Sequence, residues 1–109
     1  MARVLVVDDE GLMRTMVQVV CNRLGHETLM AGSIQEGLRM AVEPVDLVLL
    51  DVWLPDGNGL EHQAEFARLP GSPDVVVITG NGDGDNAEAA LRSGAWEFLT
   101  KPLQMRDIE

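Results

Sequence analysis

The sequence predicts an α/β fold, a doubly wound parallel sheet of five strands, from two observations. Short continuous runs of Val and Leu are typical of strands buried on both faces. Segments with helical periodicity or with helix-start and helix-stop residues lie between these runs. Strict alternation of the two implies right-handed crossovers and helices on both faces of the sheet. A chain of 109 residues suits one domain and is too short for two ordinary ones.

Five segments are expected to form the strands. Three are strong candidates because their interiors are almost entirely apolar: Arg3 to Val7, Asp46 to Leu50 and Asp74 to Ile78. Glu27 to Ala31 and Ala95 to Thr100 are weaker candidates.

The helices are predicted from spacing and from capping residues. Apolar residues recur at helical spacing between the first two strands, and Gly25 follows them as a helix stop. Ser33 and Glu36 have the form of a capping box, which opens a second helix. The first expected helix contains Leu12, Met16, Val19, Val20 and Leu24, and the second begins at Ser33 and ends before Pro44. The third runs from about Leu60 to Leu69, the fourth from about Asp85 to Ser93, and the fifth begins after Pro102.

The charge balance limits the direct partners of the chain. Eight basic and eighteen acidic side chains give a formal charge of −10, which disfavours a nucleic-acid surface or an anionic membrane. A cationic partner or a metal ion fits better, although surplus acids also keep a small protein soluble.

The single cysteine and the short apolar runs favour a cytoplasmic protein. Cys21 has no partner for an intramolecular disulfide, which fits a reducing compartment, and we interpret it as a helix-packing residue. The N-terminal apolar run is too short for a secretory signal, and no run approaches the ~20 residues of a membrane span.

Polar residues follow the strands at the edge of the sheet where ligands of such folds gather. Asp8 and Asp9 follow the first strand, Asp51 the third, Thr79 the fourth, and Lys101-Pro102 the fifth. Each alone has an ordinary explanation as a solvated loop, a strand former or a turn. Together they form a constellation: carboxylates are hard-oxygen ligands for Mg²⁺, and a lysine and a hydroxyl can hold phosphoryl oxygens.

Four motifs then identify a family. VLVVDDE, LVLLDVWLPDGNGLE, VVVITGNGD and AWEFLTKPL occur in this order, and the sequence resembles the receiver domain of bacterial two-component response regulators over essentially the whole chain. The resemblance implies a flavodoxin-like (βα)5 fold with strand order 2-1-3-4-5, formed by residues 1–109.

The resemblance also implies roles for individual residues. Asp51 would accept a phosphoryl group from a sensor histidine kinase. Asp9, Asp51 and the backbone carbonyl of Trp53 would bind Mg²⁺ directly, and Asp8 would act mainly through a water. Lys101 would contact a phosphoryl oxygen.

A second set of residues would transmit the signal. Thr79 would be the switch hydroxyl, Phe98 the aromatic residue whose rotamer follows it, and Lys101-Pro102 a cis peptide. Phosphorylation would shift a population between two states. The changed surface would be the face formed by the fourth helix, fifth strand and fifth helix, where any homodimer would also form.

Trp53 departs from the commonest family pattern because it is bulkier than most residues at that position. Its side chain could shield an acyl phosphate from water; alternatively, it covers the site or packs at a partner surface.

Other functions are weighed against this one. A haloacid-dehalogenase-type phosphatase expects a second Asp where Trp53 stands, and a flavin binder needs a hydroxyl-rich loop in place of DDEG. A receiver-like interaction module that is never phosphorylated stays open as the alternative. His26 and His62 lack metal-ligand spacing and are interpreted as surface residues.

The output of the regulator is expected to be transcription. LTKPL and ITGNGD are similar to receivers attached to transcription activators with an ATPase domain; a stand-alone regulator or a receiver joined to a signalling enzyme are the alternatives. Because QMRDIE gives the last helix barely two turns, we expect that the natural chain continues.

Overall fold

A five-stranded parallel sheet forms the centre of the molecule. The computed structural model describes residues 2–79 and 97–100. Within them the strand order is β2-β1-β3-β6-β7, which confirms the doubly wound fold and the order expected from the resemblance, because β6 and β7 are the fourth and fifth strands of that scheme. The strands are β1 (Arg3–Val7), β2 (Glu27–Ala31), β3 (Leu47–Asp51), β6 (Asp74–Thr79) and β7 (Glu97–Thr100).

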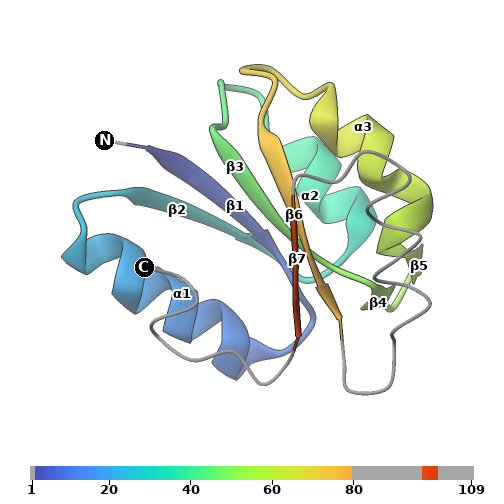
Figure 1. The fold of residues 1–109 in the computed structure, drawn as a ribbon, viewed down its shortest axis with the longest axis horizontal. Coiled ribbons are helices and arrows are strands. Elements are labelled where there is room, and N and C mark those ends of the chain that lie inside the picture. The colour runs from blue at the N-terminus through green and yellow to red at the C-terminus, as the bar shows by residue number, and fades with distance from the viewer. Residues whose placement is uncertain (1, 80–96, 101–109) are drawn as a thin grey trace.

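Helices cover both faces of this sheet (Figure 1). Helix α1 (Gly11–Arg23) lies on one face, and α2 (Ile34–Met40) and α3 (Gln63–Ala67) lie on the other. The segment predicted as the third helix begins as a 3₁₀ helix, Gly59–His62, and continues as α3. None of the described helices is long and apolar enough to cross a membrane.

The core consists of two layers, one on each face. The larger cluster joins the sheet to α2 and α3 through Ile34 and Phe66, and the smaller joins it to α1 through Met13, Val17 and Cys21. Strands β1 and β3 are buried along almost their whole length, as are Val75 to Ile78 of β6, which explains their continuous apolar sequences. Cys21 is buried and unpaired, as expected of a packing residue.

The prediction of α1 is confirmed, but its buried face differs from the pattern that indicated the helix. Leu12, Val19 and Leu24 are exposed, and the buried residues of α1 are Met13, Val17, Val20 and Cys21, of which only Val20 belonged to the predicted set. These four follow the spacing i, i+4, i+7 and i+8 of a single helix face. The helix is apolar on more than the side that the sheet covers, so its sequence alone does not indicate which side is buried.

The expected fourth helix, from about 85 to 93, and the fifth, after Pro102, lie outside the described residues.

Candidate functional site

The register of the sheet brings two aspartates to the same edge. Val7 of β1 is paired with Leu50 of β3, and the next residues along these two neighbouring segments are Asp8 and Asp51. On the other side of β3, Asp51 is paired with Ile78, the residue before Thr79. Parallel pairing therefore places both acids at the same end of the two strands, where the sheet reverses its strand order.

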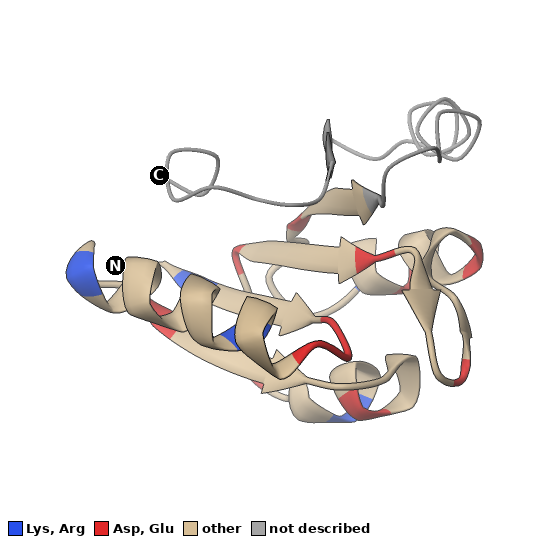
Figure 2. Cartoon of the chain, turned by 90° about the horizontal axis from the view of Figure 1, so that it is seen from below, with Lys and Arg blue, Asp and Glu red and all other residues tan. Residues whose placement is uncertain are grey.

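Three carboxylates meet at this edge. One ligand oxygen from each of Asp8, Asp9 and Asp51 lies within 4.8 Å of the others. Figure 2 shows acidic residues gathered where arrows of the sheet end. This is the one group of three or more such side chains able to hold a metal ion in the part of the chain that the structure describes. The expected grouping of these three acids is therefore confirmed.

The burial of the group has an electrostatic consequence. Asp8 is 0% exposed and Asp51 4%, whereas Asp9 faces solvent. Carboxylates that are close together and shielded from water repel one another and lose hydration. A divalent cation offsets both the repulsion and the lost hydration, and an all-oxygen set of donors suits Mg²⁺. The residues present therefore fit the ion that the sequence indicates.

Backbone contacts fix the acidic turn. The Asp8 amide donates to the Ala31 carbonyl oxygen at 3.0 Å, and Asp8 Oδ1 accepts from the Glu10 amide at 2.9 Å. In addition, Arg14 Nη1 of α1 donates to the Asp8 carbonyl oxygen at 2.8 Å. The sequence gives little indication of this contact, because Arg14 stands there as a lone arginine one helical turn after Glu10.

The loop after β3 folds back as a short hairpin. Strands β4 (Trp53–Leu54) and β5 (Gly57–Asn58) pair antiparallel, with Trp53 opposite Asn58. The Gly59 amide then donates to the Val52 carbonyl oxygen at 2.7 Å. Trp53 begins this hairpin two residues after Asp51, and 57% of its surface is exposed.

Gly59 is the position where the hairpin returns to the site. A Cβ built there would lie 2.1 Å from the Asp51 carbonyl oxygen, a separation that no side chain can adopt. Only glycine lets this backbone approach Asp51 so closely.

Asp56, at the tip of the hairpin, contacts the start of α2. Its Oδ1 accepts from the Ile34 amide at 2.9 Å, and its Oδ2 accepts from the Gln35 amide at 3.0 Å. The hydrogen bonds from Gln35 and then Ile34 hold the pKa of Asp56 below its ordinary value. Ser33 Oγ accepts from the Glu36 amide at 3.2 Å, which confirms its predicted capping role.

The other predicted residues are described in part. Thr79 is the last residue of β6 and is paired with Thr100 of β7, while Phe98 is paired with Val77. The backbone therefore brings Thr79 to the acidic edge. Lys101 and Pro102 lie outside the described residues.

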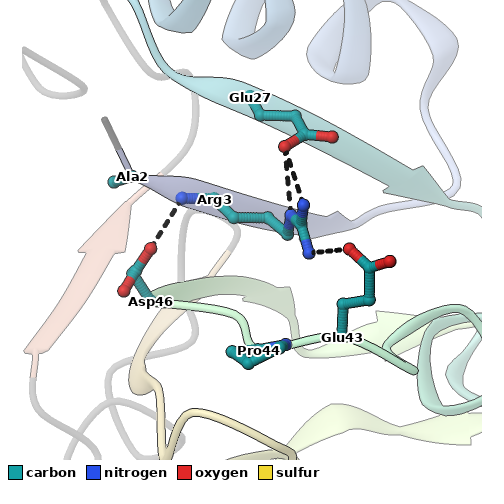
Figure 3. A pocket seen from close by; sticks show the side chains of 6 residues that line it. All are labelled: Ala2, Arg3, Glu27, Glu43, Pro44 and Asp46. Carbon is teal, nitrogen blue, oxygen red and sulfur yellow. Dashed lines mark hydrogen bonds and ion pairs between the residues drawn. The ribbon is translucent and has the colours of Figure 1, made fainter.

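A hollow of about 330 Å³ lies at the opposite end of the strands (Figure 3). Arg3 bonds there to Glu43 at 2.7 Å and to Glu27 at 3.0 Å, and its amide donates to Asp46 Oδ2 at 2.7 Å. The bonds to Glu43 and then Glu27 raise the pKa of the guanidinium. The three acidic side chains of this hollow therefore all bind Arg3, at the start of β1.

The histidines take no part in the acidic group. His26 Nδ1 accepts from the Ala2 amide at 2.9 Å, and His62 Nδ1 lies 2.7 Å from Glu65 Oε1. Both rings are half-buried and lie outside the cluster that could hold a metal.

Known proteins match the chain along nearly its whole length. A family model described as response regulator receiver domain matches residues 4–109. Response regulator protein PilR of Pseudomonas aeruginosa is 40% identical in an alignment of 105 positions that covers 94% of this chain and 23% of PilR. This chain thus spans about a quarter of PilR, and 48% of the KDP operon transcriptional regulatory protein KdpE of Escherichia coli.

Solved structures are similar in fold. A crystal structure of a response regulator from Burkholderia pseudomallei with a phosphorylated aspartic acid, calcium ion and citrate has a TM-score of 0.89 and 26% identity, covering 99% of this chain and 64% of that one. The beryllofluoride-activated NtrC4 receiver domain dimer has a TM-score of 0.88 and 33% identity, covering 99% of this chain and 90% of that one.

Proposed function

This chain belongs to the response regulator receiver domain family, and we propose that it accepts a phosphoryl group from a sensor histidine kinase on Asp51 in a Mg²⁺-dependent reaction. The observation that carries the proposal is the meeting of the Asp8, Asp9 and Asp51 carboxylates within 4.8 Å at one edge of the sheet. The related Burkholderia protein with a phosphorylated aspartic acid supports the same chemistry.

Mg²⁺ would be held by Asp9, Asp51 and the carbonyl oxygen of Trp53, with Asp8 acting through a water. When bound, the ion neutralises the carboxylates and the phosphoryl oxygens that approach them. Arg14 and the Ala31 carbonyl oxygen keep the Asp8 backbone in place, so that its carboxylate is already aimed at the site before the ion arrives.

The transfer itself is a nucleophilic substitution at phosphorus. A carboxylate oxygen of Asp51 forms the new O–P bond while the P–N bond to the donor imidazole breaks, and the imidazole leaves with the electron pair. Lys101 and Thr79 would contact the transferred oxygens. Asp51 is only 4% exposed, so the donor must reach its carboxylate through a small accessible surface, and the substitution needs an in-line approach there.

The acyl phosphate would then change the output surface. Thr79 would move toward the phosphoryl group and Phe98 would turn inward, altering the face formed by the fourth helix, fifth strand and fifth helix. A homodimer through that face and control of transcription by an attached domain are part of the proposal. They are supported by similarity to the NtrC4 receiver dimer and to longer transcriptional regulators.

The domain would act as a phosphorelay acceptor and not as an enzyme with a separate substrate, catalysing only its own phosphorylation and dephosphorylation. We place it in the cytoplasm, where a lone thiol such as that of Cys21 stays reduced.

Intact-mass measurement tests the proposal. The chain is incubated with acetyl phosphate, with Mg²⁺ or with a chelator, as wild type, Asp51→Asn and Asp74→Asn. The last is a matched control, because Asp74 is an exposed acid at the opposite end of β6. We expect one phosphoryl adduct, dependent on Mg²⁺, in wild type and in Asp74→Asn only. A folded wild type that binds Mg²⁺ yet forms no adduct would instead identify an interaction module that is never phosphorylated.

A further inference from the structure

The hairpin after Asp51 and the start of α2 come from distant parts of the chain, yet one side chain joins them. Helix α2 follows β2, whereas the hairpin follows β3, and β1 lies between these two strands. Asp56 crosses this distance and accepts hydrogen bonds from the amides of Ile34 and Gln35, 22 and 21 residues away in sequence.

These two bonds complete the first turn of the helix. The first amides of a helix have no carbonyl partner within it. In α2 the Glu36 amide donates to Ser33 Oγ, and the amides of Ile34 and Gln35 donate to Asp56. Each carboxylate oxygen of Asp56 thus has one amide donor, and the negative charge lies at the positive end of the helix dipole.

Packing holds the hairpin in the same place. Gly57, next to Asp56, has φ +149°, and a Cβ added there would lie 3.4 Å from Cδ1 of Ile34. Ile34 is itself buried against the sheet. The hairpin tip is therefore fixed to an element that belongs to the core.

The other end of the hairpin, away from its tip, lies next to Asp51 of the acidic site. Trp53 stands at the start of β4, and Gly59 packs on the carbonyl group of Asp51. With both ends held, the backbone between Asp51 and Gly59 has a defined path. Val52 and Leu54, the neighbours of Trp53, are buried in the core, and the hydrogen bonds of the tip add to the restraint that this packing and the short pairing of β4 with β5 place on the backbone of Trp53.

We infer that Asp56 is a positioning residue for the metal site, because its two hydrogen bonds to the first turn of α2 hold the hairpin that presents the Trp53 carbonyl oxygen beside Asp51. The inference rests on the proposed function, in which that oxygen is a Mg²⁺ ligand. Partners that orient metal ligands contribute about 10–100-fold to affinity. Since Asp56 acts through the backbone, we expect the lower end of this range.

The test compares two variants that cap the same helix differently. Asp56→Ala removes the bonds from the hairpin, whereas Ser33→Ala removes a capping bond of α2 and leaves the hairpin attached. Mg²⁺ is titrated into each ¹⁵N-labelled protein while the amide signals of Trp53, Ile34 and Gln35 are followed. Amide exchange of Ile34 and Gln35 reports release of the tip, and shift changes at Trp53 give the dissociation constant for Mg²⁺.

We expect Asp56→Ala to raise that dissociation constant about tenfold, Asp56→Asn to raise it less because one acceptor oxygen remains, and Ser33→Ala to leave it at the wild-type value. Wild-type affinity in Asp56→Ala, or equal loss in Ser33→Ala, would overturn the inference and leave Asp56 as a helix cap alone. If Asp56→Ala does not fold, the dissociation constants of Asp56→Asn and Ser33→Ala for Mg²⁺ are compared instead, and the same two outcomes support or overturn the inference. A wild type that does not bind Mg²⁺ would refute the proposed function instead.

Discussion

At the scale of single residues, the site depends on a glycine as much as on its acids. The backbone of Gly59 lies against the Asp51 carbonyl group, and any side chain there must displace it. The functional carboxylate and the glycine are eight positions apart in sequence. Their contact exists because the hairpin between them returns to the end of β3.

We predict that Gly59→Ala destabilises the protein and weakens Mg²⁺ binding together. Overpacking typically costs about 1–3 kcal/mol, and a Cβ at 2.1 Å from a backbone oxygen belongs at the upper end of that range or beyond. Urea denaturation and Mg²⁺ titration measure the two effects.

Gly32→Ala is the matched control for this prediction. It also lies in a loop at the same edge of the sheet, but its Cβ would meet only the end of the Arg14 side chain, at 3.5 Å. Equal loss of stability in the two variants would contradict the account of Gly59.

Trp53 gives a second prediction at this scale, which concerns the lifetime of the acyl phosphate. The indole is partly covered and adjoins the loop of the phosphoacceptor, so we expect it to restrict water. Trp53→Asn should lose its phosphoryl group several-fold faster than wild type, measured by the decay of the adduct mass after the donor is removed.

Val42→Asn controls for the loss of an exposed apolar side chain, because Val42 is 81% exposed and follows α2. Equal lifetimes in wild type and Trp53→Asn would contradict a shielding role and leave the indole as a surface contact.

At the scale of elements, the first turn of α2 should make the stability of the protein depend on pH. The pKa of Asp56 is lowered from its ordinary value of 3.8 because the folded protein donates two amides to the ionised carboxylate. The ionised Asp56 therefore stabilises the folded protein fully when the pH is above the pKa of this group in the unfolded chain. The stabilisation is lost as the pH falls through its lower pKa in the folded protein.

The difference in urea midpoint between wild type and Asp56→Asn should accordingly be constant from neutral pH down to about pH 4 and decrease below it. A difference that grows on acidification would contradict the assigned hydrogen bonds.

The packing of α2 on its neighbours depends on Gly37. A Cβ there would lie 3.0 Å from Cγ2 of Val7 and 3.2 Å from Cε1 of Phe66. We predict that Gly37→Ala is destabilising in the wild type, because crowding outweighs the gain in helix propensity of about 1 kcal/mol. With Phe66→Leu, which makes room, the same change should be less destabilising or favourable. A double-mutant cycle measures this coupling, and strictly additive effects would contradict it.

At the scale of the whole molecule, the sequence was sufficient where the signal is local. The sequence predicted the strands of the parallel sheet closely but not the hairpin strands β4 and β5, and the strand-end acids were expected at one edge because parallel strands end together. Asp51 proved to be the last residue of β3 itself, one position later than the predicted end.

The features that sequence reasoning missed are long-range. Asp56 adds to the cap that Ser33 provides, because it accepts from the amides of Ile34 and Gln35, and it does so from 22 residues away. Similarly, the side of α1 that is buried depends on the sheet, and the bond of Arg14 to the Asp8 carbonyl oxygen depends on a side chain crossing a turn. Local periodicity contains no information on such pairings.

The central claim is that one particular carboxylate of three accepts the phosphoryl group. Borohydride reduces an acyl phosphate to an alcohol, so treatment of the phosphorylated chain should convert the modified aspartate to homoserine, which peptide mass spectrometry locates. We predict homoserine at position 51 alone, formed only after incubation with donor and Mg²⁺. Homoserine at position 8 or 9, or an adduct that leaves no homoserine, would contradict the account.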